Sequence, residues 1–281
     1  MGIKLKSKEL CGEIITQLKK DVSLLKKSSI EPTLASVLIG NDGGSIFYTG
    51  IQKKKCDEVG IKYNLHRLPE DISFQELKTL VEKLNNDENI HGILIQSPLP
   101  KGLDGRDVFN LIKPEKDIDC QTTTNIGKVY SGEFDFAPCT AISALELAKQ
   151  TGVKFEGKDV VVIGRSNVVG KPLFQLLNNE NATVTVCHLK SKDIDKKCRE
   201  ADIVFACAGS PKLVDASYVK EGSILIDIGT TNVDGKIVGD INLEEVIDIA
   251  DYVSTVPGGV GPLTTIILLR NVVSNAKKSK E

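Results

Sequence analysis

Short apolar runs alternate with amphipathic stretches through the first half of the chain. From residue 7 to residue 27, apolar side chains recur at intervals of three and four, which predicts a helix with one buried face. A second helix is expected over residues 45–59, with Ser45 as its N-cap. The other elements expected in this half are strands at 34–39, 63–68 and 93–95, and helices at 73–84 and 104–112.

The second half continues the same alternation and adds a proline- and glycine-rich loop at 257–262. Strands that alternate with helices are typical of an α/β fold with a mainly parallel sheet, which we expect here. The elements predicted in this half are strands at 160–163, 183–187, 203–206 and 223–228, and helices at 141–151, from Gly170 onwards, at 192–200 and at 263–274.

The stretch VVVIGRSNVVGKPL, residues 160–173, has the pattern of a nucleotide-binding corner. Its four β-branched residues predict a strand buried on both faces. The turn Gly164-Arg165-Ser166 follows, and backbone N–H groups at the start of the next helix would attract a pyrophosphate. Gly170 would let this helix pack closely on the strand. Because the spacing is Gly-x-Ser-x-x-Val-Gly rather than Gly-x-Gly-x-x-Gly, an ordinary strand–turn–helix corner remains an alternative.

The composition is that of an ordinary globular protein. Of the 281 residues, 41% are hydrophobic and 26% are charged, and the net charge of −2 argues against a general nucleic-acid-binding protein. We expect no membrane span and no secretory signal, because the apolar runs are short and the N-terminus is polar. Seven scattered cysteines and three separated histidines favour a reducing cytoplasm and predict no metal site.

Six stretches of the sequence, taken together, resemble one enzyme family. They are SIFYTGIQKKK at 45–55, GILIQSPLP at 92–100, PEKDID at 114–119, PCT at 138–140, VVVIGRSNVVGKPL at 160–173 and VPGGVGPLT at 256–264. In this order they resemble the methylenetetrahydrofolate dehydrogenase/methenyltetrahydrofolate cyclohydrolase family. The resemblance implies two α/β domains with a cleft between them. It also implies a homodimer that binds tetrahydrofolate substrates and a nicotinamide cofactor.

The resemblance further implies how the chain is divided. Residues 1–140 and 263–281 would form the folate-binding catalytic domain, to which the last helix returns. Residues 141–262 would form a Rossmann-type domain that binds NAD(P).

Matching positions imply roles for individual residues. Tyr48 would stack its ring on the folate, and Gln96 would lie beside the catalytic position. Asp119 would anchor the pterin, whose adjacent N–H donors suit a bidentate carboxylate. Pro257 and Gly258 would contact the substrate. The residues that would contact the cofactor are Thr140, Gly164, Arg165, Ser166, Thr230, Gly258, Gly259 and Gly261.

Each of the folate-site residues also has a simpler interpretation. Tyr48 could be a core aromatic residue on an amphipathic helix, and Asp119 could be a solvated acid in a charged turn. Gln96 could satisfy backbone groups at the end of a strand. Asp119 is moreover followed by Cys120 and Gln121, where the family commonly has a glycine and an apolar residue.

One departure from the family pattern bears directly on the chemistry. The family places a lysine four residues after the tyrosine, where it serves the cyclohydrolase reaction, and here that residue is Gln52. Lys53 does not replace it, because one residue turns a helix by about 100°. Lys55 shares the face but lies about 10 Å from Tyr48.

A glutamine cannot titrate, whereas hydrolysis of the methenyl cation calls for an acid/base group. Hydride transfer needs chiefly alignment of the methylene carbon with the nicotinamide. We therefore predict an oxidoreductase that retains dehydrogenase activity and has lost cyclohydrolase activity or keeps very little. Its catalytic site would contain Tyr48, Gln52, Gln96 and Asp119.

The choice between NADP and NAD depends on two basic residues. Arg165 could pair with a 2′-phosphate, and Lys190, after the strand at 183–187, could help. No acidic residue stands at that strand end to bind a free ribose hydroxyl, so NADP is favoured over NAD. Leu189 occupies a position where the family often has a polar contact, which keeps NAD open.

Three other functions stay open at this point. The first is a fully bifunctional enzyme in which another group replaces the lysine. The second is a catalytically silent folate- or nucleotide-binding protein. The third is a Rossmann dehydrogenase for a different substrate.

Overall fold

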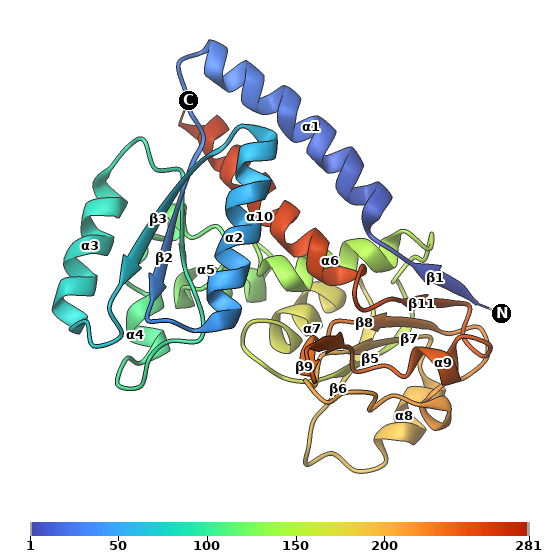
Figure 1. The fold of residues 1–281 in the computed structure, drawn as a ribbon. Coiled ribbons are helices and arrows are strands. Elements are labelled where there is room, and N and C mark those ends of the chain that lie inside the picture. Colours follow the sequence, from blue (N-terminus) through green and yellow to red (C-terminus); the bar gives the residue numbers. More distant parts are fainter. Residues whose placement is uncertain (1, 280–281) are drawn as a thin grey trace. The chain divides into compact units, whose positions relative to one another are not determined.

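The computed structural model describes residues 2–279, which divide into two compact units. The six-stranded unit comprises the residues up to Cys11, together with Val129–Glu133 and Pro138–Thr264. The three-stranded unit comprises Gly12–Lys128, Phe134–Ala137 and the residues from Thr265 on. Figure 1 shows the elements of each unit.

A parallel sheet in the order β3-β2-β4 forms the centre of the three-stranded unit. Strand β2 (Thr33–Ile39) lies in the middle, and all seven of its residues are buried. Strands β3 (Lys62–Leu68) and β4 (Gly92–Ile95) form the two edges. The helices and 3-10 turn that lie wholly or mainly in this unit are α1 (Lys8–Lys27), α2 (Gly43–Val59), α3 (Phe74–Asn86), α4 (Gly105–Phe109), η1 (Pro114–Lys116) and α5 (Thr123–Ser131).

Helix α2 begins earlier than predicted, and its N-cap is Asp42 rather than Ser45. The Asp42 carboxylate accepts hydrogen bonds from the Ser45 backbone N–H and hydroxyl, both at 2.8 Å. A carboxylate three residues upstream thus satisfies the helix N-terminus, so Ser45 lies inside the first turn. Two consecutive glycines, Gly43 and Gly44, concealed this boundary in the sequence.

Helix α4 is shorter than the predicted helix at 104–112. It ends at Phe109, and the next residues continue in turns in which Ile112 N–H donates to the Phe109 carbonyl at 3.1 Å. Pro114 disfavours the α conformation at Lys113, the residue before it, but does not account for the end at Phe109.

The six-stranded unit is built on a parallel sheet in the order β1-β11-β8-β7-β5-β6. Its centre is apolar: the four residues after Asp159 in β5 are buried, as are all residues of β7 and β8. The strands are β1 (Ile3–Leu5), β5 (Asp159–Ile163), β6 (Thr183–Cys187), β7 (Ile203–Ala206), β8 (Ile224–Asp227) and β11 (Tyr252–Ser254).

Counted from β5, the strand order is 2-1-3-4-5, that of a doubly wound fold. The chain passes from β5 to β6 on one side and returns to β7 on the other, which makes the carboxyl end of β5 a topological switch point. Open α/β sheets bind ligands at such points. The other elements that begin in this unit are α6 (Cys139–Lys149), α7 (Gly170–Asn179), α8 (Ile194–Glu200), η2 (Ala216–Tyr218), α9 (Leu243–Val246), α10 (Val260–Lys278) and the antiparallel pair β9 (Thr231–Val233) and β10 (Lys236–Val238). The residues of α10 from Thr265 on belong to the three-stranded unit.

The predicted class, two α/β domains of which the second is of Rossmann type, is confirmed in both units. Helix α10 and strand β1 differ from the prediction. Helix α10 starts at Val260 rather than at residue 263, so Pro262 lies in its first turn, where a proline costs no hydrogen bond. Strand β1 was not predicted, because its three residues are set by pairing with β11 far along the chain.

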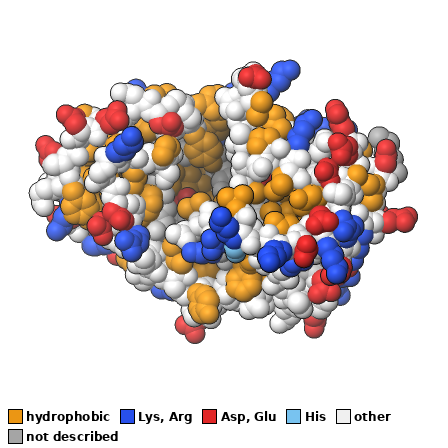
Figure 2. Space-filling view, turned by 90° about the horizontal axis from the view of Figure 1, so that it is seen from below, with side chains coloured by type: hydrophobic (Ala, Val, Ile, Leu, Met, Phe, Trp, Pro, Cys, Tyr) orange, Lys and Arg blue, Asp and Glu red, His pale blue; other side chains and the backbone are white. Residues whose placement is uncertain are grey.

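Charges of both signs are mixed on the surface. In the face drawn in Figure 2, lysine and arginine side chains alternate with aspartate and glutamate side chains. This agrees with the net charge of −2. In the described part of the chain, no helix is long and apolar enough to cross a membrane.

Candidate active site

Helix α2 carries two of the predicted residues on one side. Gln52 is completely buried, and Tyr48, one turn earlier, is half-buried. The Thr265 hydroxyl of α10 donates to the Tyr48 hydroxyl at 3.3 Å. Lys53 is exposed and pairs with Asp57 at 2.8 Å on the outer face of the helix. The prediction that Lys53 points away from Gln52 is confirmed.

The side chain of Gln52 lies in a buried polar network. Its Oε1 accepts hydrogen bonds from the Tyr63 hydroxyl and from Gln96 Nε2, both at 3.1 Å. The Ser36 hydroxyl also reaches this oxygen at 3.5 Å and itself accepts from Gln96 Nε2 at 2.9 Å. Ser36 comes from β2, Tyr63 from β3 and Gln96 from the residue after β4. Three strands and one helix therefore meet at Gln52.

This network gives the Gln52 amide a defined orientation. Burial raises the pKa of Tyr63 to about 12, so the phenol stays protonated at neutral pH and acts as a donor. Two donors at about 3 Å occupy the lone pairs of the Gln52 oxygen. Its Nε2 group is buried and has no hydrogen-bond partner among the described residues. Gln52 is therefore a hydrogen-bond donor toward whatever else enters this site.

Asp119 lies in a loop that a neighbouring carboxylate organises. Asp117, two residues earlier, is fully buried and accepts from the backbone N–H groups of Gln121 at 2.8 Å and Thr122 at 2.9 Å. It also accepts from the Thr122 hydroxyl at 2.7 Å and from Asn125 Nδ2 at 3.0 Å. Asp119 itself is half-buried. Sequence reasoning singled out Asp119 and missed that Asp117 holds the loop in shape.

Cys120, next to Asp119 in this loop, has a backbone conformation that glycine usually adopts. Its φ of 53° lies in the left-handed region that a glycine adopts without cost. The cysteine side chain is 2% exposed, so its burial offsets part of that strain.

In the six-stranded unit, most predicted cofactor residues follow the carboxyl ends of strands. Gly164, Arg165 and Ser166 follow β5, Lys190 follows β6, and Thr230 follows β8. Pro257, Gly258 and Gly259 follow β11, and Gly261 lies in the first turn of α10. Because the sheet is parallel, these ends lie along one edge. Thr140 instead stands in the first turn of α6.

The corner after β5 requires both of its glycines. A Cβ on Gly164, whose φ is +130°, would lie 2.3 Å from the Cys207 carbonyl oxygen. A Cβ on Gly170 would lie 2.2 Å from the Gly164 carbonyl oxygen, which confirms the predicted close packing of helix and strand. The Ser166 hydroxyl accepts from the Val169 N–H at 3.2 Å. The serine side chain therefore stabilises this turn, and the backbone at the corner stays open to a pyrophosphate.

The basic residues near this corner are accessible. Arg165 and Lys190 are both exposed, and Leu189 is 98% exposed. The Lys190 N–H donates to His188 Nδ1 at 3.2 Å, which holds the turn after β6.

Two buried carboxylates, which the sequence analysis missed, shape the same edge of the sheet. Asp240 accepts from the backbone N–H groups of Ala208, Gly209 and Ser210 at 2.6 to 3.0 Å, and so fixes the loop after β7. Asp227 accepts from the N–H groups of Gly229, Asp240 and Ile241 at 2.9 to 3.1 Å.

Burial raises the pKa of Asp227 to about 7, with a smaller contribution in the same direction from Asp240, while the backbone donors oppose the shift. The signal for this pair in the sequence was weak, since each acid merely stands next to a glycine or an apolar residue.

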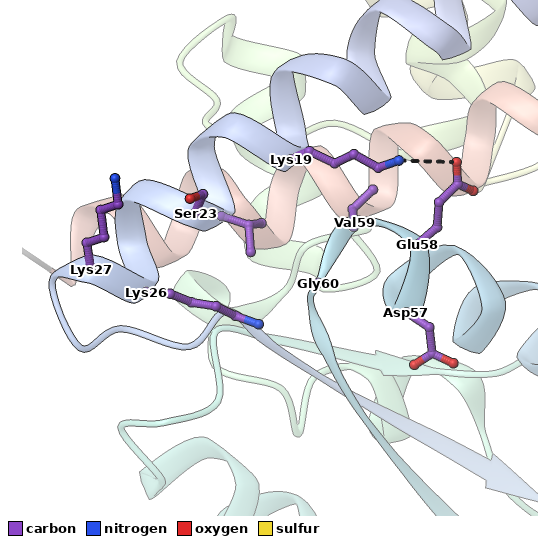
Figure 3. Close-up of a pocket in the computed structure, with 9 residues that line it drawn as sticks. Lys19, Ser23, Lys26, Lys27, Asp57, Glu58, Val59 and Gly60 are labelled. Atoms are coloured by element: carbon purple, nitrogen blue, oxygen red, sulfur yellow. Dashed lines mark ion pairs between the residues drawn. The ribbon is translucent and has the colours of Figure 1, made fainter.

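One open groove of the three-stranded unit lies away from these residues. It has a volume of about 590 Å³ and runs between α1 and the end of α2. Figure 3 shows its lining, in which Lys19 reaches Glu58 at 3.9 Å while Lys26 extends beside Gly60. Its lysines and acids lie on the surface, and it includes none of the predicted site residues.

A doubly wound parallel sheet with a glycine turn at its switch point defines a dinucleotide-binding unit. Comparison with known proteins places the whole chain in a family. The model of the tetrahydrofolate dehydrogenase/cyclohydrolase catalytic domain matches residues 5–119, and that of the NAD(P)-binding domain of the same enzymes matches residues 138–280. The chain belongs to the tetrahydrofolate dehydrogenase/cyclohydrolase family.

Relatives match over their full lengths. Bifunctional protein FolD of Clostridium perfringens (strain 13 / Type A) is 46% identical over 268 residues, which cover 95% of this chain and 97% of that protein. The crystal structure of the bifunctional enzyme FolD from Campylobacter jejuni has a TM-score of 0.96 at 40% identity and covers 99% of both chains. The Trypanosoma brucei enzyme, complexed with NADP cofactor and inhibitor, has a TM-score of 0.95 at 35% identity. The match covers 100% of this chain and 99% of that one.

Proposed function

We propose that the protein is an NADP-dependent dehydrogenase that oxidises 5,10-methylenetetrahydrofolate to 5,10-methenyltetrahydrofolate, reversibly, with cyclohydrolase activity lost or very low. The observation that carries the second part is the environment of Gln52. This residue is buried, cannot titrate, and has its only acceptor atom occupied by Tyr63 and Gln96. It therefore has no free lone pair with which to take a proton from water.

The neighbouring groups do not supply the missing base. Tyr63, with its pKa raised to about 12, keeps its proton at neutral pH. The side chains of Ser36 and Gln96 do not gain or lose a proton near neutral pH. Hydride transfer makes no such demand on this network, because a lone pair of the substrate itself pushes the hydride.

In this proposal the chain binds the folate through Tyr48, Gln96 and Asp119, with Pro257 and Gly258 at its edge. The folate domain corresponds to residues 1–140 and 263–281, and the cofactor domain to residues 141–262. Bound NADP would accept the hydride. Thr140, residues 164–166, Thr230 and the glycines at 258, 259 and 261 would hold and orient it, and the close approach of backbone at Gly164 and Gly170 fits such a ligand. A homodimer and a cytoplasmic location complete the proposal.

The wild-type protein provides the test. We expect the methenyl absorbance to rise and persist when methylenetetrahydrofolate and NADP are added. A rise that then decays by catalysed hydrolysis would show the bifunctional enzyme, as the relatives named bifunctional suggest. No rise, together with ligand binding in calorimetry, would show a silent binding protein.

The cofactor preference has its own expected result. The exposed Arg165 and Lys190 can both approach a 2′-phosphate, and NADP is the cofactor bound in the Trypanosoma brucei relative. We expect kcat/KM to be higher with NADP than with NAD. Raising the ionic strength should narrow the difference, because it screens exposed charges. A preference for NAD at low ionic strength would contradict this assignment.

A further inference from the structure

Gln121 forms an unusual pair of hydrogen bonds with strand β4. Its Oε1 accepts from the Ile95 backbone N–H at 3.3 Å, and its Nε2 donates to the Ile95 carbonyl at 3.0 Å. Strand β4 lies at the edge of its sheet: one side pairs with β2, and the side toward Gln121 has no neighbouring strand of that sheet among the described residues. The Gln121 amide thus takes the place that a neighbouring strand would have.

The backbone of Gln121 is itself fixed. Its N–H donates at 2.8 Å to Asp117, whose carboxylate also holds Thr122 and Asn125. Asp117 is fully buried and forms a parallel bridge with Ile93 of β4. The loop between Asp117 and Gln121, which contains Asp119, is therefore attached to β4 at both of its ends.

The residue after Ile95 is Gln96. Its N–H donates to the Val37 carbonyl of β2 at 2.9 Å, so the backbone at the end of β4 is held by β2 on one side and by Gln121 on the other. From this position the Gln96 side chain reaches both Ser36 and Gln52. A shift of the strand end would break these contacts.

We propose that Gln121 is a positioning residue that sets Asp119 and Gln96 at a fixed separation, so that a pterin anchored at Asp119 presents its reacting carbon beside Gln96. This inference rests on the proposed function. It concerns a feature of this chain, because the family commonly has an apolar residue at this position. An apolar side chain could pack here but could not pair with the Ile95 peptide.

The first test replaces Gln121 by methionine, which keeps the length of the side chain and loses both hydrogen bonds. We expect kcat/KM for methylenetetrahydrofolate to fall about tenfold, since small misplacements of reacting groups have effects of this order or larger. The KM for NADP should change by less than about twofold, because the change lies in the other unit. Gln75→Met, on the exposed face of α3, is the matched control and should behave as wild type.

The second variant, Gln121→Glu, tests whether activity depends on the hydrogen bonds of residue 121. A role in packing alone would not make the activity of this variant depend on pH. The ionised carboxylate accepts from the Ile95 N–H but repels the Ile95 carbonyl. The protonated acid can both accept and donate, as the amide does. We expect the activity of this variant, relative to wild type at the same pH, to recover as the pH falls through the glutamate pKa.

Amide hydrogen exchange separates this proposal from the proposed function. In Gln121→Met the Ile95 amide should exchange at least about tenfold faster, whether or not the enzyme transfers hydride. If wild type transfers no hydride, the proposed function fails, and the exchange at Ile95 and the affinity for tetrahydrofolate still decide the inference. Unchanged exchange at Ile95, wild-type kcat/KM in Gln121→Met, or equal losses for folate and NADP would each overturn it.

Discussion

Gln52→Lys is expected to give the protein a methenyltetrahydrofolate cyclohydrolase activity about 10²- to 10⁴-fold above that of wild type, the usual range for a positioned acid/base group. Hydrolysis of purified methenyltetrahydrofolate, followed by loss of its absorbance, measures the change. Dehydrogenase activity should remain within about tenfold of wild type, because hydride transfer depends mainly on alignment.

The polar side chains around residue 52 explain why a lysine can function there. The Ser36 and Tyr63 oxygens and the Gln96 amide oxygen, after rotation of that amide, can accept from an ammonium group. The site is completely buried, and burial lowers the pKa of an amine toward neutrality. A lysine here would therefore exchange protons near neutral pH, which a glutamine cannot do.

Gln52→Met is the matched control, because it fills a similar volume without donor, acceptor or charge. Its hydrolysis rate should stay at the wild-type level. If wild type itself already hydrolyses the methenyl compound rapidly, the proposed loss of cyclohydrolase activity is wrong. If Gln52→Lys folds, binds folate and hydrolyses no faster than Gln52→Met, the attribution of the lost activity to Gln52 is wrong.

Local patterns predicted the elements that a few neighbouring residues determine. The run from Val160 to Ile163 is a buried strand because β-branched residues on both faces suit a central parallel strand. The helical period likewise put Gln52 on the same face as Tyr48 and Lys53 on another face, and in the structure Gln52 is buried and Lys53 is exposed. The error at the start of α2 was also local in origin. Asp42 and Ser45 are both good caps, and the two glycines between them let the helix begin at the earlier one.

Contacts distant in sequence could not be predicted in this way. Tyr63 joins Gln52 only because β3 lies beside β2, and Gln121 reaches Ile95 across 26 residues. The pair Asp227 and Asp240 is set by the loops after β7 and β8. In each case the residue type is ordinary, and its role depends on a partner that only the folded chain brings near. The family resemblance located the residues expected to touch ligands and left out those that hold them.

Gly170→Ala is expected to abolish cofactor binding and to destabilise the six-stranded unit by about 3 kcal/mol or more, at the upper end of overpacking effects. The added methyl carbon would lie 2.2 Å from the Gly164 carbonyl oxygen and 2.9 Å from the Arg165 Cα, so the collision is with backbone and cannot be relieved by a side-chain rotation. Helix α7 would have to move away from β5, and with it the N–H groups that are proposed to face a pyrophosphate. Calorimetric titration with NADP and chemical unfolding measure the two effects.

The same type of substitution at Gly12, Gly12→Ala, is expected to have the opposite effect on stability. Gly12 lies inside helix α1, and a Cβ there would meet nothing within 4 Å. Alanine should therefore stabilise the protein by about 1 kcal/mol through helix propensity alone, with NADP affinity unchanged. If Gly170→Ala bound NADP as tightly as Gly12→Ala, the corner after β5 would not be the pyrophosphate site. The cofactor assignments at residues 164–166 would then also be wrong.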